Sequence, residues 1–483
     1  NGSEIVDEPE ENHNHLLTIR LEVDNSLEPA WRVINDRNPE GKRISAYDRE
    51  TLGAVKISDY YDWQFSWSQG SILSRILDER EDTRAVLAKA RRSTRSSLDP
   101  DSLPTIKKSA EKAQSIGERL GIPVKSEQGY LPKIDLRSVN IGASVLSLHD
   151  GAVPVRQSGM GTSRLLSVGM QLESGQFGGI TLIDEVEYGL EPYRIRRLVE
   201  ILRKGERMLQ AEDDEQIENI RNQIIISTHS PVVICELEPS EVSIVRADSG
   251  EVSIQEPTSS LRRHIRRCPD AFLARKVIVC EGKTEIGFCR ALNSFFQKRR
   301  QPFEYLGVAY ADGGGSDASN TALSFAKLKY DTAYFGDSDT PLYPDEAELM
   351  RSGVCVVIWE GNLSIEERVF EDTPEDGFIK IANLIIQEWG SDTVRDKMAR
   401  KFCIEPSSIG SDVEAWINTK ASDVSFRKAF GEIAKKRGVG WLKRVDLGEK
   451  LGHIVTEYWG LIQDTHLARG IKQLTDWVYD QGD

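Results

Sequence analysis

The stretch Lys276-Val277-Ile278-Val279-Cys280-Glu281-Gly282-Lys283-Thr284-Glu285 decides the fold of the second half of this chain. It predicts a short buried strand from Val277 to Cys280 that stops at the carboxylate of Glu281. Gly282 follows, and an amphipathic helix then begins, with Glu285 about one turn away from Glu281. Open α/β sheets bind their ligands just outside the carboxyl ends of the strands, so Glu281 stands where such a site would lie.

A second acidic strand end follows in Tyr334-Phe335-Gly336-Asp337-Ser338-Asp339, an apolar strand that ends in Asp-x-Asp. Two acidic strand ends in one parallel sheet can converge on a hard divalent cation, because Mg²⁺ takes a few carboxylate oxygens and keeps several waters. Glu281, Glu285, Asp337 and Asp339 are therefore candidate metal ligands. The simpler alternative is that these acids only terminate strands and begin helices.

The segment Gly282-Lys283-Thr284 looks like the end of a phosphate-binding P-loop, Gly-x-x-x-x-Gly-Lys-Ser/Thr. Such a loop needs a glycine at position 277, and that residue is Val277. There is also no glycine-rich turn ahead of it to surround a phosphate. The P-loop interpretation is therefore rejected for this stretch.

Strands and helices alternate regularly after residue 276, which predicts a parallel sheet. The expected order is strand 276–281, helix 284–297, strand 305–311, helix 319–329, strand 332–337, helix 344–351 and strand 354–359. A glutamate after the first strand and an Asp-x-Asp after the third resemble the Toprim metal-binding domain of topoisomerases, primases and some nucleases.

The first half of the chain carries a different set of motifs. Ser158-Gly159-Met160-Gly161 precedes an amphipathic helix, and small residues at a helix start leave backbone N–H groups free for an anion. A buried strand, 179–183, then ends in Asp184-Glu185, and a strand at 223–226 ends shortly before His229.

These segments, in this order, resemble the C-terminal half of an ABC-type ATPase such as that of SMC proteins. The resemblance implies that Ser158, Gly159 and Gly161 belong to the signature loop, which binds ATP. It also implies that Asp184 holds Mg²⁺ through water, that Glu185 positions the attacking water and that His229 senses the γ-phosphate. All of these roles suit phosphoryl transfer, which depends on positioning and charge stabilisation.

The sequence departs from that pattern in one respect: none of its 483 residues forms a P-loop. In ABC-type enzymes the P-loop lies N-terminal to all the motifs above. Either it lies ahead of Asn1, as a first residue other than Met favours, or this ATPase lacks it.

An ABC-type ATPase followed by a Toprim domain resembles the OLD (overcoming lysogenisation defect) family of nucleases, over residues 16–260 and 272–455. The Gabija nuclease subunit and some retron effectors are of this kind. The resemblance implies a metal-dependent DNA endonuclease controlled by ATP and active in anti-phage defence. Its two ions, Mg²⁺ or Mn²⁺, would be held by Glu281, Glu285, Asp337, Asp339 and Glu366, with Lys443, or else Arg444, as the basic catalytic residue.

The fold implied is an α/β one with three parts. An ABC-type ATPase core occupies 1–258, a Toprim parallel α/β domain 270–375, and a helical C-terminal region 376–483. A charged helical insertion at 76–121 is expected to mediate dimerisation or contact a partner, although a solvated arm is equally compatible with its charge. The expected partners are DNA, further copies of the chain and a second defence protein such as a helicase or reverse transcriptase.

The charge composition limits how this chain can bind nucleic acid. The net charge of −15 argues against a surface coated for nucleic acid, but it allows a local basic strip. Such a strip precedes the first Toprim strand and is expected to contact DNA phosphates, the alternative being a solvated helix face. The basic strip consists of Arg262, Arg263, Arg266, Arg267 and Arg275.

The compartment is expected to be the cytoplasm. The sequence contains no run of 18 apolar residues, so no membrane span is predicted, and the N-terminus shows no signal peptide. The six cysteines form no Cys-x-x-Cys and suggest reduced, buried thiols.

Two other functions fit part of the sequence. The chain could be an ATP-gated nucleic-acid-binding scaffold or sensor, or a DNA-repair ATPase without nuclease activity. A binding-only site would gain nothing from five acids facing phosphate, and a repair ATPase does not explain Glu281 and Asp337.

Overall fold

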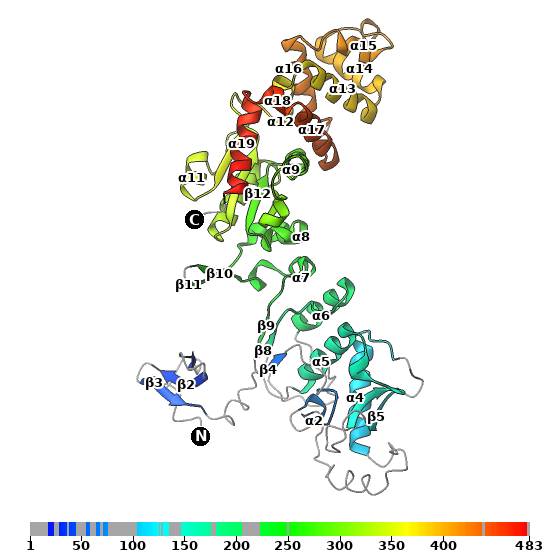
Figure 1. Ribbon diagram of the computed structural model, residues 1–483, viewed down its shortest axis with the longest axis vertical. Coiled ribbons are helices and arrows are strands. Elements are labelled where there is room, and N and C mark those ends of the chain that lie inside the picture. Colours follow the sequence, from blue (N-terminus) through cyan, green and yellow to red (C-terminus); the bar gives the residue numbers. More distant parts are fainter. Residues whose placement is uncertain are drawn as a thin grey trace. The chain divides into compact units, whose positions relative to one another are not determined.

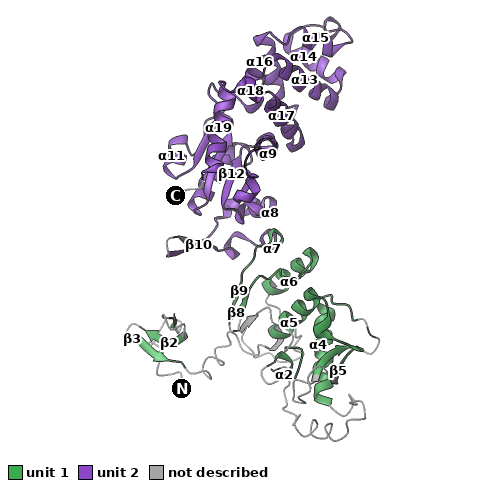
Figure 2. Ribbon diagram, in the orientation of Figure 1, with its two compact units in different colours: residues 1–233 green, residues 234–483 purple. Residues whose placement is uncertain are grey.

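The computed structural model describes residues 18–23, 29–35, 38–44, 55–57, 64–67, 71–75, 104–124, 126, 129–134, 146–174, 180–204, 223–248, 251–436 and 440–480. Packing divides the chain into two compact units, Asn1–Val233 and Ile234–Asp483 (Figure 2). Both contain parallel strands and helices, so the expected mixed α/β class is confirmed at that level (Figure 1). The domain limits expected from the motifs stay a prediction.

The described part of the first unit contains three small sheets. An antiparallel sheet is formed by β1 (Thr18–Val23), β2 (Pro29–Asn35) and β3 (Asn38–Arg43), and a second one by β5 (Tyr130–Ile134), β6 (Leu146–Asp150) and β7 (Val153–Pro154). The third is parallel, in the order β4 (Val55–Ile57), β8 (Ile180–Ile183), β9 (Gln223–Ile226). Its helices are α2 (Ile72–Arg75), α4 (Pro104–Arg119), α5 (Met160–Ser174) and α6 (Pro192–Lys204), and α7 (Pro231–Glu236) leads into the second unit.

Helix α4 is the described part of the expected insertion at 76–121, of which residues 76–103 lie outside the described residues. Its buried stripe of Ile106, Ala110, Ala113 and Ile116 follows helical spacing. A Cβ added at Gly169 of α5 would lie 2.7 Å from the Ile116 side chain, so the two helices are in close contact. The described part of the insertion is therefore packed and is not a solvated arm.

The second unit is built on a four-stranded parallel sheet in the order β13 (Val308–Asp312), β12 (Lys276–Cys280), β14 (Asp331–Gly336), β15 (Cys355–Ile358). Helices α9 (Lys283–Phe296), α10 (Ala318–Lys327) and α11 (Glu346–Arg351) connect these strands, as the sequence predicts. The strand expected from residue 305 begins only at Val308. A 3₁₀ turn at Phe303–Leu306 precedes it, and Gly307 ends that turn with a φ of 73°.

Both faces of this sheet are buried, which explains the continuous apolar runs of its strands. Ile278 and Cys280 point into one core together with residues of α9 and α19 (His466–Tyr479). Val277 and Val279 point into the other core, which α10 and α11 cover. Neither face of β12 is therefore exposed to solvent, and the strand ends at Glu281, the first candidate metal ligand.

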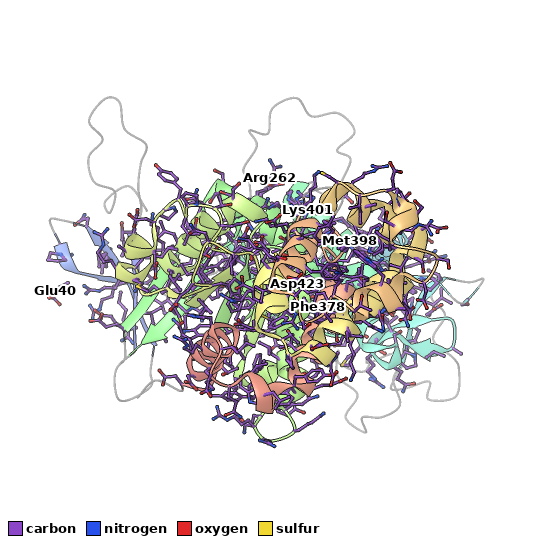
Figure 3. The ribbon with its side chains drawn as sticks, turned by 90° about the horizontal axis from the view of Figure 1, so that it is seen from above. Glu40, Arg262, Phe378, Met398, Lys401 and Asp423 are labelled. Carbon is purple, nitrogen blue, oxygen red and sulfur yellow. The ribbon has the colours of Figure 1, made fainter. Side chains whose placement is uncertain are left out.

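The C-terminal region is helical, as predicted, and shares a core with the sheet. Its other helices are α12 (Ile365–Asp372), α13 (Glu375–Trp389), α14 (Ser391–Phe402), α15 (Val413–Asn418), α16 (Val424–Ala434), α17 (Val445–Glu457) and α18 (Trp459–Ile462). Phe378 packs with Phe370 and Phe430 at centroid distances of 5.6 and 5.5 Å. Figure 3 labels Phe378 and Met398, two fully buried side chains of this region.

Helices α9 and α17 approach each other until their backbones touch. A Cβ added at Gly287 of α9 would lie 2.0 Å from the carbonyl oxygen of Val445, and one at Gly448 would lie 2.3 Å from that of Thr284. Gly452 faces Ala291 in the same contact. This approach brings the start of α17, and with it Lys443, to the start of α9.

The first residue of β12 is joined to the last turn of α19. Lys276 Nζ donates hydrogen bonds to the carbonyl oxygens of Trp477 (2.9 Å) and Asp480 (2.6 Å), and it pairs with Asp331 at 3.0 Å. The C-terminal helix thus fixes the amino end of the central strand.

Strands β10 (Ile244–Asp248) and β11 (Glu251–Gln255) form an antiparallel pair that belongs to the second unit. Two residues that face each other across this pair contact the rest of the unit. The Arg246 guanidinium lies 4.2 Å from the centre of the Tyr330 ring, and Lys329 Nζ donates to Ser253 Oγ at 3.1 Å.

Two further expectations concern membranes and thiols. Among the described residues, no helix combines the length and apolarity needed to cross a bilayer. All six cysteines are free thiols. The expectation of buried thiols is right for Cys280 and Cys289 and wrong for Cys403, which is exposed.

Candidate metal centre and nucleotide site

Glu281 and Asp337 meet where β12 and β14 end side by side. The Asp337 N–H donates to Glu281 Oε2 at 2.8 Å, and the Tyr334 hydroxyl donates to the same oxygen at 3.4 Å. A Cβ added at Gly336 would lie 2.9 Å from that oxygen, so glycine at this position leaves room for the carboxylate. The parallel register thus brings the two acidic strand ends together.

Glu285 reaches the same place from the first turn of α9. Its Oε2 accepts the N–H of Gly282 at 2.8 Å, and only 3% of the residue is exposed. Burial, and after it the negative charge of Glu366, raises the pKa of Glu285 to about 8. The acid at the helix start is therefore part of the site and does more than begin a helix.

Glu366 enters from the first turn of α12 and is fully buried. Its Oε1 lies 2.9 Å from Lys443 Nζ and accepts the Thr284 hydroxyl at 3.3 Å. Its Oε2 is buried without a hydrogen-bond partner. A buried carboxylate oxygen without a partner costs free energy, so this oxygen is available for a further ligand.

Asp337 completes the acidic group. Its Oδ1 accepts the N–H of Ile365 at 2.7 Å. Burial, followed by the charges of Glu285 and Glu366, raises the pKa of Asp337 well above its usual range. The carboxylates of Glu281 and Glu366 are thus close enough to oppose the ionisation of Glu285 and Asp337.

Lys443, two residues before α17 begins, places a positive charge beside the four carboxylates. Burial works against that charge, but the carboxylates of Glu366, Glu285 and Asp337 together hold the pKa of Lys443 above its ordinary value. Arg444, the alternative to Lys443, points elsewhere: its guanidinium pairs with Glu388 at 2.6 Å and with Asp446 at 2.5 Å.

Asp339 is the one candidate ligand that the structure leaves apart from the other four. Its contacts in the described part of the chain are an ion pair with Lys435 at 3.4 Å and the Thr340 hydroxyl at 3.3 Å. Lys435 lies after α16 and also pairs with Glu367 at 2.9 Å. The sequence analysis missed this contact, which joins residues 96 positions apart.

The residues present fit a divalent cation by their chemistry. As the side chains stand, no three His, Cys, Asp or Glu residues among those described are arranged to hold a metal ion. One oxygen of each acid is engaged by an N–H or ammonium group, as described above. The second oxygen of Glu366 is unpartnered, and the group contains three buried acids and the half-buried Glu281 with one lysine. A cation would bind the unpartnered oxygen and offset the excess negative charge.

The basic strip lies on and near α8 (Arg262–Arg267). Arg263 Nη2 donates to the carbonyl oxygen of Gly313 at 2.9 Å, and the Gly315 N–H donates to the Glu281 carbonyl at 2.7 Å. The turn that Arg263 contacts is therefore bonded to the backbone of the acidic site.

The other arginines of the strip differ in their surroundings. Arg262 and Arg266 both pair with Glu238, at 2.8 and 2.7 Å, which offsets part of their charge. Arg267 and Arg275 are exposed, as is Arg262, which Figure 3 labels.

In the first unit, the glycine-rich loop and the segment after Glu185 touch each other. A Cβ added at Gly161 would lie 2.3 Å from the carbonyl oxygen of Gly189, so both glycines are required by a backbone contact. Gly159 and Met160 are exposed beside it, and Ser158 is half-buried.

Asp184 and Glu185 follow β8 and are held by the neighbouring strand end and by α5. Ser227 Oγ donates to Asp184 Oδ1 at 2.5 Å and accepts the Glu185 N–H at 2.9 Å. The buried guanidinium of Arg164 donates to the carbonyl oxygens of both acids. Glu185 has a φ of 44°, an uncommon conformation that these contacts maintain.

His229 is positioned by a residue that sequence reasoning missed. Glu187 accepts the His229 N–H at 2.6 Å and the Thr228 hydroxyl at 2.7 Å. It thereby ties the loop after β8 to the loop after β9. Glu187 lies two residues after Glu185, just beyond the end of a predicted strand. That position could have identified it as a candidate site residue.

Comparison with known proteins gives one family match. Residues 8–235, just under half of the chain, match the family model described as "AAA domain, putative AbiEii toxin, Type IV TA system". This match supports an AAA-type ATPase domain, and hence ATP binding, in that part of the chain. A search of curated proteins finds no match.

Two solved structures are also similar in part. One is an SMC head bound to the C-terminal winged-helix domain of ScpA, with 14% identity over 51% of this chain and 68% of that one, at a TM-score of 0.26. The other is the C-terminal region of the OLD protein of Xanthomonas campestris pv. campestris, with 15% identity over 42% of this chain and 99% of that one, at a TM-score of 0.21. At these TM-scores neither structure carries an inference by itself.

Proposed function

We propose that the second unit is a Toprim-type nuclease that hydrolyses DNA phosphodiesters with Mg²⁺ or Mn²⁺, and that the ATPase domain controls it. The observation that carries this proposal is the group formed by the buried Glu285, Asp337 and Glu366 and the half-buried Glu281, with Lys443 beside it. Its location at the carboxyl end of a parallel sheet is where open α/β folds bind ligands.

The four acids would hold the cations, and each of them has an oxygen left for this in the described structure. Divalent cations at such a site lower the pKa of a bound water and stabilise charge on the phosphate. Lys443, whose side chain is 40% exposed, can donate an N–H to a phosphate oxygen as negative charge develops there. Arg263, beside the Gly313 carbonyl, can contact a neighbouring phosphate.

The first unit fits a nucleotide-dependent control element. The carboxylates of Asp184 and Glu185, the N–H groups near Gly161 and the imidazole of His229 are the chemical groups that phosphoryl transfer requires. A role in anti-phage defence and a second protein partner are proposals that rest on the resemblance to OLD proteins. An ATP-gated DNA-binding scaffold is the competing function, and it requires no cleavage.

The test is nicking of supercoiled plasmid with Mg²⁺ or Mn²⁺. We expect the wild-type chain to nick DNA and Glu281→Ala to lose the activity at least a hundredfold, because the site loses a ligand. Glu346→Ala, which removes an exposed glutamate of α11, is the matched control and should cut like the wild type. Equal cutting by wild type and Glu281→Ala would refute the nuclease proposal, whereas metal-independent DNA binding without cutting would favour the scaffold.

A further inference from the structure

Lys435 stands at the border between the acidic group and the loop after β14. Its ammonium group pairs with Glu367 at 2.9 Å and with Asp339 at 3.4 Å. The ion pair engages Asp339, the second acid of Asp-x-Asp, apart from the other four acids.

We propose that Lys435 is a positioning residue that keeps Asp339 out of the acidic group, so that cations bind in two unequal steps. The proposal rests on the nuclease function above. Glu281, Glu285, Asp337 and Glu366 lie close enough to interact, and they would provide the tighter site. Asp339 becomes available for a second cation only when its ion pair with Lys435 opens.

The first step is supported by burial. Asp337, Glu285 and Glu366 are 6%, 3% and 0% exposed, and Glu366 Oε2 has no hydrogen-bond partner. Charges in such surroundings are poorly screened, so their attraction for a cation is strong. A cation in this group requires no change at Lys435.

The second step is weaker because Lys435 competes for Asp339. The side chains of Lys435 and Asp339 are 32% and 25% exposed, and ion pairs of this kind contribute modestly, about a fewfold in an equilibrium constant. Glu367 retains Lys435 when Asp339 leaves, because the start of α12 holds it: Glu367 Oε2 accepts the Ser364 N–H at 2.9 Å, and the Glu367 N–H donates to the Ser364 hydroxyl at 3.3 Å. The ammonium group then stays beside the site, where it can meet a substrate phosphate.

Calorimetric titration of the metal-free 483-residue chain with Mn²⁺ tests the proposal without any cleavage assay. The wild type should bind Mn²⁺ in two phases. In Lys435→Met, which keeps the aliphatic chain and removes the charge, the second phase should tighten about fivefold while the first changes less than twofold. Lys435→Arg should restore the wild-type pattern, and Asp339→Asn should lose the second phase in either background.

Lys436→Met is the matched control, because Lys436 is an exposed neighbour of the same charge. An equal shift in this variant, or an unchanged second phase in Lys435→Met, overturns the proposal. A single phase that Glu281→Ala abolishes also overturns it and leaves the nuclease function standing. If the wild type binds no Mn²⁺, both fall together.

Discussion

Single residues at the acidic site show a conflict between folding and function. Asp337, Glu285 and Glu366 are buried close together, and the raised pKa values of Asp337 and Glu285 record the free energy needed to ionise them there. Acids at two strand ends could be predicted from the sequence, because parallel strands bring their carboxyl ends to one edge. The contact of Asp339 with Lys435 could not, since the two are 96 residues apart and meet only through packing.

This conflict predicts that Asp337→Asn stabilises the metal-free protein. The amide keeps the Oδ1 that accepts the Ile365 N–H and removes a charge opposed by Glu285 and Glu366. In EDTA the melting temperature should equal or exceed that of the wild type, while plasmid nicking is lost. Asp345→Asn is the control, since this exposed carboxylate only accepts the Glu348 N–H at the start of α11; a clear drop in melting temperature for Asp337→Asn alone would contradict the charge argument.

In the nucleotide site, Glu185→Gln should slow ATP hydrolysis by about a hundredfold or more and preserve ATP binding. The amide has the shape of the carboxylate but cannot accept a proton from water. Turnover and binding are measured separately, in a chain that also carries a P-loop. Glu111→Gln, an exposed change on α4, serves as control, and unchanged turnover in Glu185→Gln would remove this residue from the role of base.

At the scale of secondary structure, the packing of strands and helices determines where the side chains of the acidic site lie. The strand–acid–helix segment of β12 and α9 was predicted almost to the residue, because its apolar run, Gly282 and helical spacing are local signals. The contact between α9 and α17 was not, because Gly287, Gly448 and Gly452 become informative only when the two helices are placed side by side. The strand pair of β10 and β11 also depends on a distant contact: Arg246 lies against the ring of Tyr330, far along the chain.

Gly448→Ala should therefore affect both stability and activity. The added Cβ would lie 2.3 Å from the Thr284 carbonyl oxygen, so α17 must move and carry Lys443 with it. We expect a loss of about 2 kcal/mol in the free energy of unfolding, as overpacked contacts usually cost, and at least a tenfold loss of nicking. Gly460→Ala has open space around its Cβ and should change neither; equal behaviour of the two variants in chemical denaturation would contradict a tight helix contact.

At the scale of the whole molecule there are two compact units, and we expect the chain to associate through the first. In ABC-type enzymes a signature loop contacts nucleotide held by another copy, so the proposed role of Ser158–Gly161 requires an oligomer. The AAA domain match is consistent with this but does not identify the contact.

Met160→Glu should weaken that association. Met160 is 56% exposed at the start of α5, beside Gly189, and a charge there would be buried on association. Sedimentation at micromolar concentration with ATP should show the wild type as a dimer or larger and the variant shifted toward monomer. Val153→Glu, at a residue 52% exposed elsewhere in the same unit, is the control; a monomeric wild type would contradict the expectation.

The bonds from Lys276 to Trp477 and Asp480 also bear on how this protein is made. The ribosome synthesises β12 about two hundred residues before the last turn of α19, which fixes the amino end of β12. Lys443 is also synthesised long after β12. Domains fold as their chains emerge, but these two hydrogen bonds can form only when α19 has been made. The proposed nuclease site is therefore expected to gain its full support only after synthesis has passed Asp480, so unfinished chains should not cut DNA.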